Sequence, residues 1–511
     1  MQVQRTVRRR PIDWLACAAV LLVLPSLALA QTTTPEPPKL DAVAKAVADA
    51  ATAINFVWVL VAGFLVMFMQ AGFALVETGF TRAKNAGHTI TMNFMVYGIA
   101  MLAYWVIGFA LQAGGVGALS TLGGYAGLSH EFTLTLFGKE FGLFGTTGFF
   151  LTGVAYNASV FAYFLFQMVF MDTAATIPTG ALAERWKFAS FAVFSVFIGA
   201  LIYPVFANWA WGGGWLSQLG KNFGLGHGYV DFAGSGVVHL TGGVMALVTA
   251  IMLGARRGKY NADGSSNTIP AHNLPMALLG TFILAFGWFG FNAGSTLAGM
   301  DVRIAVIAVN TMLAGAMGSA AAMIYMWMRT GKPDPGMCAN GALAGLVAIT
   351  APCAFVTAPS AVIIGLVAGL LVSVAAPFID QKLHIDDPVG AIAVHGVNGL
   401  FGVLAVGLFA DGTYGDGTNN VTGGVRGLFY GDGTQIIAQG IGALSNLIWV
   451  GLSAFVAWKI TGALVRGHRV SSSVEDEGLD IPEMGVLAYP ADHASAAVLP
   501  EAPRRKAVEA A

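Results

Sequence analysis

Charge is scarce in this chain of 511 residues. Asp, Glu, Lys and Arg together make up only 10% of the sequence, where a soluble domain has roughly 25%, so a fully water-exposed surface cannot be built from it. The 26 Lys and Arg nearly balance the 27 Asp and Glu, which excludes the basic stripe of a nucleic-acid-binding protein. The 56% of hydrophobic residues excludes a disordered chain, because disorder requires few of them.

Cysteine is almost absent as well. The chain has three cysteines, Cys17, Cys338 and Cys353. The last two bracket one apolar segment, and 15 residues of helix at 1.5 Å each would place them roughly 22 Å apart. That separation excludes a disulfide between them.

The sequence has long apolar runs instead. Eleven segments of about 17 to 27 residues, each long enough to cross a hydrocarbon core of about 30 Å, begin near residues 55, 90, 153, 188, 234, 273, 303, 336, 358, 389 and 434. Glycine is abundant, at 66 residues, as expected where membrane helices pack closely. The pattern predicts an all-α polytopic membrane protein with eleven transmembrane helices.

The two ends of the chain differ from this pattern. Residues 1–30 have an Arg-rich start, an apolar stretch and the tripeptide Ala28-Leu29-Ala30, which is typical of a cleaved signal peptide; an uncleaved first membrane anchor is the alternative. We expect residues 31–54 to form a periplasmic N-terminal segment and residues 55–464 the membrane domain. The apolar runs stop there, and residues 465–511 are expected to form a cytoplasmic tail.

The placement of Lys and Arg predicts the orientation, because these residues collect in cytoplasmic connections. Twelve fall on the side of the expected tail: Arg82, Lys84, Arg185, Lys187, Arg256, Arg257, Lys259, Arg329, Lys332, Lys382, Arg466 and Arg469. Four fall on the other side: Lys139, Lys221, Arg303 and Arg426. We therefore expect the N-terminus outside and the C-terminus inside, in the cell inner membrane.

Two short sequence patterns occur twice, in the same order. The first and sixth segments contain F-x-x-x-G-F, at residues 68–73 and 286–291, and the fifth and tenth contain Val-His, at 238–239 and 394–395. Many carriers consist of two repeats of opposite topology with the substrate site between them. The sequence therefore predicts a 5+5 inverted repeat, with the eleventh helix added.

His239 and His395 are the strongest functional candidates, since an ionisable group inside a membrane span is costly and normally faces a pathway or a partner. Each lies about seven residues, or roughly 11 Å of helix, from the end of its span. The two spans enter from opposite sides, so both histidines should meet near the midplane and share a proton. A structural role for each, with a backbone carbonyl as partner, is the alternative.

Other residues allow two interpretations each. Asp231 is either a helix N-cap or the source of a negative potential at an outer vestibule. Trp211 is either an interfacial anchor or a cation-π wall for a small cation. Phe170 and Phe291 belong either to the core or to a gate, and Ser295 is either a helix-end hydroxyl or part of an outer pore mouth.

Two further acids lie inside the spans. We expect Glu77, five residues before Arg82, to form a structural ion pair with it near the inner face. Asp172 lies two residues beyond Phe170, or about 200° around the helix, so it should point away from whatever Phe170 lines. Its role is open.

The expected path is narrow and apolar, which limits what can cross it. Moving an unpaired ammonium-sized ion into such a medium costs tens of kcal/mol by idealised Born estimates. Removing a proton from an amine of pKa about 10 at pH 7 costs only about 4 kcal/mol. The path therefore favours a cation that can become a neutral molecule, and ammonium is the obvious small one.

Several longer motifs indicate a family. They are QAGFALVETGFTRAKN at 70–85, GALAER at 180–185, WGGG at 211–214, DFAGSGVVH at 231–239, FGWFGFNAGS at 286–295, AGLVAITAPCA at 344–354 and VHG at 394–396. With these motifs the chain resembles the ammonium transporter family (Amt/Mep/Rh), on its bacterial Amt side, over about residues 55 to 490. The resemblance implies a transporter and not an enzyme, without metal or cofactor, assembled as a homotrimer whose protomers each contain a pore.

The resemblance also implies residue roles. Trp211, Ser295 and Phe166 would bind ammonium outside, with Asp231 shaping that site. The stacked gate would be Phe170 with Phe291, and the pore would contain His239 with His395 as a twin-His pair. Ammonium would leave its proton and cross as ammonia.

The tail also resembles the family, at GLDIPEMG, residues 478–485, and AYP, residues 488–490. In the family this cytoplasmic region couples subunits and, in bacteria, meets PII-type signalling proteins. Met484 stands where a His is common there, so a PII partner is an open question.

Three other functions remain as alternatives. Two membrane histidines can be axial haem ligands in a redox protein. The chain could be an ammonium sensor or receptor that acts through a separate partner. It could also be a channel for another small neutral gas.

Overall fold

The computed structural model describes residues 39–416 and 421–490. The expected signal peptide, residues 1–30, and the last part of the tail lie outside the described residues. The chain divides into two units, residues 1–50 and 51–511. The second unit contains all eleven apolar segments expected from the sequence.

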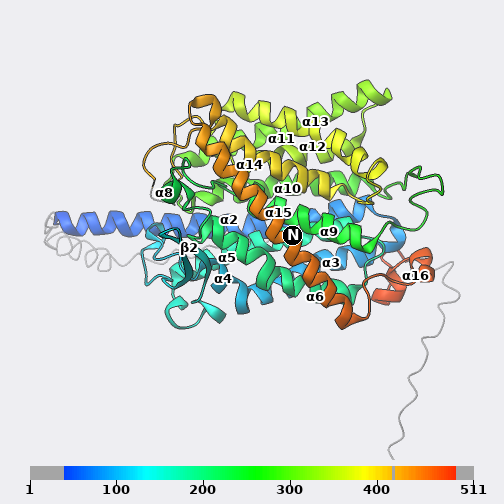
Figure 1. Ribbon diagram of the computed structural model, residues 1–511, viewed down its shortest axis with the longest axis horizontal. Coiled ribbons are helices and arrows are strands. Elements are labelled where there is room, and N and C mark those ends of the chain that lie inside the picture. The colour runs from blue at the N-terminus through cyan, green and yellow to red at the C-terminus, as the bar shows by residue number, and fades with distance from the viewer. Residues whose placement is uncertain (1–38, 417–420, 491–511) are drawn as a thin grey trace, which may run out of the picture. The chain divides into compact units, whose positions relative to one another are not determined.

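Helices make up most of the described chain (Figure 1). The longer helices, with the segments that continue them, are α2 (Leu40–Phe80), α3 (Ala86–Ala103), η2 (Tyr104–Gly108), α4 (Phe109–Ala113), α5 (Ala158–Leu182), α6 (Phe188–Phe197), η6 (Ile198–Ile202), α7 (Tyr203–Trp211), η7 (Ser235–Leu240), α9 (Thr241–Leu253), α10 (Leu274–Asn292), α11 (Arg303–Thr330), α12 (Pro335–Ile349), α13 (Ala358–Gln381), η9 (Ile392–Val397), α14 (Asn398–Phe409) and α15 (Gly433–Val465). Shorter pieces are η1 (Ala83–Asn85), η3 (Ser120–Leu122), η4 (Phe149–Leu151), η5 (Gly153–Ala155), α8 (Leu219–Phe223), η8 (Ala293–Thr296), η10 (Leu428–Tyr430), α16 (Ser472–Glu477) and η11 (Asp480–Met484).

The described residues contain ten helical segments that are long and apolar enough to cross a membrane. Each coincides with one of the expected spans, so the prediction of a helical multi-pass membrane protein is confirmed. The expected segment near residue 336 is α12, an apolar helix of 15 residues, which is shorter than the roughly 20 residues that a complete span needs.

One element was not predicted: a β-hairpin between the second and third spans. Strands β1 (Glu131–Leu136) and β2 (Lys139–Gly145) pair antiparallel, from Leu136 opposite Lys139 to Glu131 opposite Gly145, with a bulge after Phe132. The local sequence Phe-Thr-Leu-Thr-Leu alternates β-formers. Phe137 and Gly138, both with positive φ, form the two-residue turn that such a hairpin needs.

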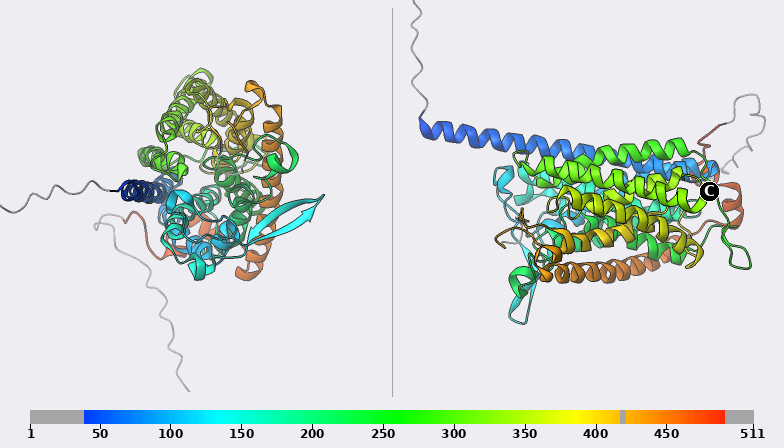
Figure 2. Two further views of the ribbon diagram at one scale, coloured as in Figure 1. Left: turned by 90° about the vertical axis from the view of Figure 1, so that its left-hand side faces the viewer. Right: turned by 90° about the horizontal axis from the view of Figure 1, so that it is seen from above.

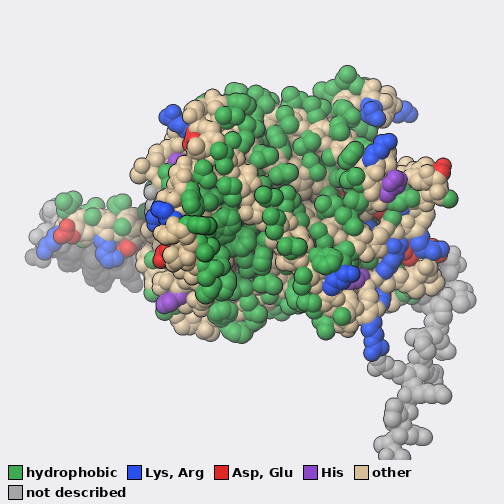
Figure 3. Space-filling model, in the orientation of Figure 1, with side chains coloured by type: hydrophobic (Ala, Val, Ile, Leu, Met, Phe, Trp, Pro, Cys, Tyr) green, Lys and Arg blue, Asp and Glu red, His purple; other side chains and the backbone are tan. Residues whose placement is uncertain are grey.

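Apolar side chains cover the middle of the molecular surface in Figure 3, while Lys and Arg gather at its ends, mainly at the end that carries α16. Large exposed hydrophobic side chains occur on α2, α10 and α15, for example Phe64, Phe282 and Ile448. Because a water-soluble protein rarely exposes so much apolar surface, this belt is the surface that faces lipid.

The helices form two groups (Figures 1 and 2). In both figures α2 to α7 lie together, α10 to α14 lie together, and α15 runs obliquely along one side of the body. Two interrupted helices, η7–α9 and η9–α14, meet between the groups, where α9 contacts η9 and α14 contacts η7.

The crossing of these two helices depends on glycine. A Cβ added to Gly243 would overlap the backbone nitrogen and Cα of Gly396, and one added to Gly399 would lie 2.6 Å from the carbonyl oxygen of Ser235. Both helices begin with a π-helical segment, a form that is frequent at functional sites. The backbones are therefore in direct contact, and their side chains can meet closely.

A buried charge cluster closes one end of the bundle. Arg256 binds Asp386 at 2.8 Å and Glu184 at 3.1 Å, with all three side chains almost fully buried. Burial opposes ionisation, but the charges of Arg185 and Arg256 hold the pKa of Asp386 well below its usual range. The cluster joins three inter-helix connections, and each of its two buried acids has an arginine partner.

The described part of the tail packs against this end. The Asp480 carboxylate accepts a hydrogen bond from the backbone N–H of His88 at 2.9 Å, and Glu475 pairs with Arg469 at 2.7 Å. Glu475 also accepts from the backbone N–H of Arg257 at 2.6 Å. The segment after α15 is thus held by contacts to α3 and to the connection after α9.

We expect Gly243→Ala to lower the stability of the folded protein by about 1–3 kcal/mol, the usual cost of overpacking. The matched control is Gly396→Ala, whose added Cβ would lie 3.5 Å from the nearest atom, an ordinary contact, and should change stability little. Thermal unfolding of both variants in detergent measures the difference. Equal unfolding temperatures for the two variants would show that the crossing is not tight.

Candidate functional site

A cavity of about 310 Å³ is lined by three of the expected site residues, Trp211, Asp231 and Ser295; we name it the outer cavity after the side of the membrane on which it is expected. The Trp211 indole nitrogen donates to the backbone carbonyl of Asp231 at 2.6 Å. The Ser295 hydroxyl donates to the carbonyl of Phe291 one turn earlier, at 2.8 Å. The Trp211 indole and the Ser295 hydroxyl therefore line the same cavity.

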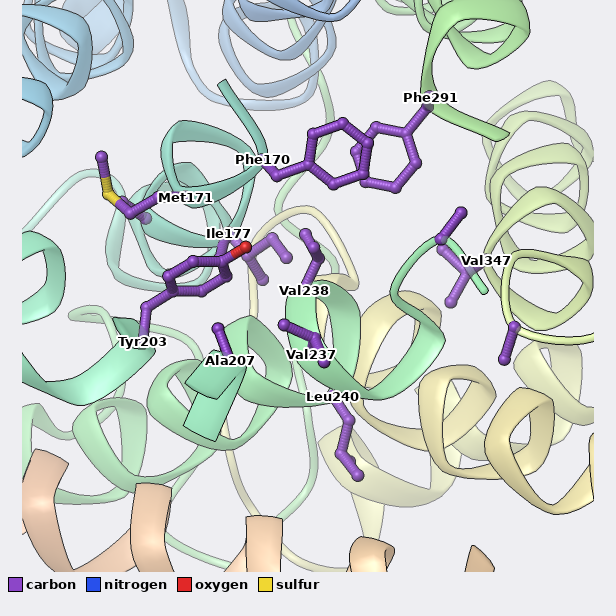
Figure 4. Packing of buried hydrophobic residues seen from close by; sticks show 14 of the residues in the cluster. Phe170, Met171, Ile177, Tyr203, Ala207, Val237, Val238, Leu240, Phe291 and Val347 are labelled. Carbon is purple, nitrogen blue, oxygen red and sulfur yellow. The ribbon is translucent and has the colours of Figure 1, made fainter. Parts of the chain in front are cut away.

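A stacked pair of phenylalanines lies beside this cavity. The rings of Phe170 and Phe291 are 4.2 Å apart between centroids and 23° from parallel, and Figure 4 shows them face to face from two different helices. Phe166 lies 4.6 Å from Phe170, and Trp211 meets Phe170 edge-on at 6.1 Å. All three phenylalanines are buried, so the stacked pair lies inside the bundle, next to the Trp211 that lines the cavity.

The two histidines are in direct contact behind the phenylalanines. Their Nδ1 atoms are 3.2 Å apart, so one must donate and the other accept, which both can do when neutral. His239 packs against two rings that also contact each other, Phe291 at 5.4 Å and Trp288 at 5.3 Å between ring centroids. Its Nε2 is buried without a hydrogen-bond partner among the described residues. His239 therefore has a buried imidazole nitrogen that no described residue occupies.

Asp231 caps the π-helical segment that carries His239. Its carboxylate accepts from the backbone N–H groups of Gly234, Gly236 and Val237 at 2.8–2.9 Å. Burial raises the pKa of Asp231 to about 6, against the lowering effect of these hydrogen bonds. The N-cap interpretation thus describes its geometry, and the same carboxylate lines the outer cavity.

Asp387 caps the π-helical segment that carries His395 in the same way. It was not among the residues expected from the sequence. It accepts from the backbone N–H of Gly390 at 3.0 Å and of Ile392 at 2.7 Å, and burial raises its pKa as well. Asp231 and Asp387 each precede their histidine by eight residues. This spacing, Asp-x7-His in both halves, was the available signal.

A second cavity, of about 20 Å³, is lined by His395, Glu77 and Asn340 among apolar side chains; we name it the inner cavity after the side of the membrane that it is expected to face. The expected ion pair between Glu77 and Arg82 is wrong. Arg82 instead binds Glu184, because that buried acid lies in the connection next to it, while Glu77 faces α3 and α5.

Asp172 joins neither cavity. Its side chain is buried, and its Oδ1 has no hydrogen-bond partner among the described residues. The structure brings the eight expected site residues into one line from the outer cavity to the inner one, and leaves Asp172 outside it.

The line has little polar surface between the two cavities. Aromatic rings and the histidine pair fill it, and a free ion would lose its hydration there at a cost of many kcal/mol. Among the residues that the structure describes, no group of three His, Cys, Asp or Glu side chains could hold a metal ion.

Comparison with known proteins shows what this chain is similar to. The model of a family described as the Ammonium Transporter Family matches residues 57–489. Ammonium transporter Amt2 of Archaeoglobus fulgidus is 44% identical over 483 residues, which cover 93% of this chain and 95% of that protein. Ammonium transporter Amt1 of Haloferax mediterranei is 38% identical over 452 residues, covering 86% and 80%.

Solved structures agree with these relatives. A protein named Sensor Amt Protein superposes with a TM-score of 0.73 at 38% identity, covering 85% of this chain and 99% of that one. Mep2 of Candida albicans gives a TM-score of 0.68 at 26% identity, covering 82% and 87%.

Asp231→Asn tests the buried cap through pH. The pKa of Asp231 in the folded protein, about 6, lies above the ordinary 3.8, so the folded protein binds this proton more tightly than the unfolded chain does. The resulting stabilisation of the fold is fully present below pH 4 and is lost as the pH rises through 6. We therefore expect the unfolding temperature of the unmodified protein, relative to the Asn variant, to fall between pH 4 and pH 7. A relative rise over this range would contradict the assignment.

Proposed function

The chain belongs to the ammonium transporter family, and from this premise we propose that it carries ammonium across the cytoplasmic membrane through a pore within each protomer. The observation that supports this most strongly is the contact between His239 and His395 in a line of buried aromatic rings. The pair combines a proton relay with a path from which ions are excluded.

Ammonium is recruited at the outer cavity. The electron-rich face of Trp211 attracts a small cation, the Ser295 oxygen can accept a hydrogen bond from it, and Phe166 adds a second aromatic wall. The buried carboxylate of Asp231 adds negative potential, and the backbone carbonyl of the same residue holds the Trp211 indole in place. A cation is thereby concentrated at the entrance without a rigid ionic cage.

The cation loses its proton before it passes Phe170 and Phe291. The stacked rings leave no place for water around an ion, so the charged form is rejected and ammonia crosses. The proton enters the histidine pair at one Nε2 and leaves at the other, because protonation on one side shifts the shared hydrogen across the Nδ1 contact. Ammonia and the proton are reunited at the inner cavity.

The topology that we propose has eleven membrane helices, with α12 as the short eighth. The N-terminus lies outside and the C-terminus inside, after cleavage of residues 1–30, with residues 31–54 periplasmic, 55–464 in the membrane domain and 465–511 cytoplasmic. The matching Asp-x7-His segments support the 5+5 inverted repeat, since each begins a helix that enters from its own side. We further propose that the protomers form a homotrimer.

A sensory role is the second candidate. One related structure bears the name Sensor Amt Protein, and the tail of this chain packs on its own membrane domain through Asp480 and Glu475. A conformational change in the pore could reach the tail through these contacts. A PII-type protein bound to the tail would respond to the same conformational change. In this tail, Met484 stands where the family commonly has a His.

The haem alternative is opposed by geometry. Nδ1 atoms at hydrogen-bond distance from each other leave no room for an iron between the two imidazoles. A current measurement distinguishes ammonium transport from passage of another neutral gas, because a neutral gas alone carries no current.

We expect reconstituted vesicles to give currents on an ammonium concentration jump, and to take up methylammonium. Replacing both His239 and His395 by Ala should reduce the current by about tenfold or more, which corresponds to about 1.4 kcal/mol of barrier, because the proton path is lost. The control is His384→Ala, an exposed histidine outside the spans, which should leave the current unchanged.

The outcomes separate the claims. If the unmodified protein gives neither an ammonium current nor methylammonium uptake, transport is refuted and the sensory role is favoured. An unchanged current in the double variant would refute only the histidine relay.

A further inference from the structure

The inner cavity contains a carboxyl group that the proposed pathway has not used. Glu77, on α2, is buried at 3% exposure and lines this cavity together with His395 from η9. At about 20 Å³ the space is about that of one small molecule such as water. An acid and the last imidazole of the pathway therefore face the same site.

Glu77 is held in place by a polar network within the bundle. Asn93 donates to its Oε2 at 2.7 Å, and the Thr179 hydroxyl lies 2.7 Å from Oε2 and 3.0 Å from Oε1. Asn93 in turn accepts from Thr176, which accepts from Gln70. The network fixes the position of the carboxyl without supplying a positive charge.

Thr179 can serve both protonation states of this carboxyl. Its hydroxyl oxygen lies within hydrogen-bond distance of two acceptors, Glu77 and the backbone carbonyl of Thr176, but it has only one proton to give. When that proton goes to Glu77, the carboxylate is stabilised. When it goes to Thr176, the hydroxyl oxygen is free to accept a proton from a neutral Glu77.

The nearest alternative acid is already occupied. Both oxygens of Asp387 accept backbone N–H groups at the start of η9, and it does not line the cavity. Among the described residues that line the inner cavity, Glu77 is the one with an acidic side chain.

We propose that Glu77 is the inner proton carrier and ammonium site of the pathway, an inference that rests on the proposed function. Ammonia that arrives beside His395 takes the proton of the neutral Glu77 carboxyl, giving ammonium and a carboxylate. The ion pair holds the ammonium until it leaves inward. The carboxylate then regains a proton from the histidine pair, which is the proton that the ammonium gave up outside.

The test is Glu77→Gln in the full-length protein, measured in vesicles from both sides. Gln keeps the size of the side chain and one oxygen acceptor, but it cannot carry the proton. We expect a current about tenfold lower and an inner half-saturating ammonium concentration about tenfold higher, while the outer half-saturating concentration is unchanged. A merely structural change would move both concentrations together or neither, and either result would overturn the proposal.

Two further variants keep the test decisive. Gln70→Leu disturbs the same network but does not line the cavity, so it should lower stability without a selective effect on the inner concentration; a shift equal to that of Glu77→Gln would refute the proposal. Glu77→Asp keeps a carboxyl and should transport better than the Gln variant, although it is the less isosteric change. Transport no better than that of Gln would also refute it.

The test of Glu77 and the test of ammonium transport fail in different ways. If the unmodified protein gives no ammonium current, the proposed function fails. If it gives a current that Glu77→Gln leaves unchanged from both sides, only the role of Glu77 fails.

Discussion

The contact between two interrupted helices at Gly243 and Gly396 is the constraint on which the rest of the site depends. No side chain on Gly243 fits between the backbones there, so the helices approach closely enough for His239 and His395 to share a hydrogen bond. Asp231 and Asp387 satisfy the exposed N–H groups at the two helix starts. Each of the two helices thus places one imidazole in the interior of the bundle, and a buried acid caps the start of each helix.

This arrangement solves an electrostatic problem. An ion in a narrow apolar path would lose its hydration, and fixed charges there would trap it. On the proposed pathway, neutral histidines and aromatic rings line the middle and the acids lie at the two ends, so no ion has to lose its hydration there and no fixed charge can trap one. On the proposed pathway, Trp211 and Asp231 attract a cation to the outer cavity, only neutral species pass the middle, and Glu77 is the first acceptor beyond the histidine pair. In this proposal the charged form of the substrate binds at the two ends of the path, and only its neutral form passes the centre.

Much of this could be predicted from the sequence. Eleven long apolar runs predicted eleven spans, because membrane insertion imposes length and composition on each one, and ten of them are helices long enough to cross a membrane. The repeated Val-His pairs indicated that two histidines would meet. The hairpin at residues 131–145 was missed because its signal is local and short. Glu77 was assigned to Arg82 by sequence distance, but burial and the position of Glu184 decide such pairings, and neither is visible in one sequence.

The central claim is that ammonium crosses only after it gives up its proton. Potassium tests it most directly, because this ion is close to ammonium in size but has no proton to lose. Currents should be measured in the same vesicles after equal concentration jumps of ammonium and of potassium. We expect a current with ammonium and none with potassium, and a potassium current of similar size would contradict passage after deprotonation.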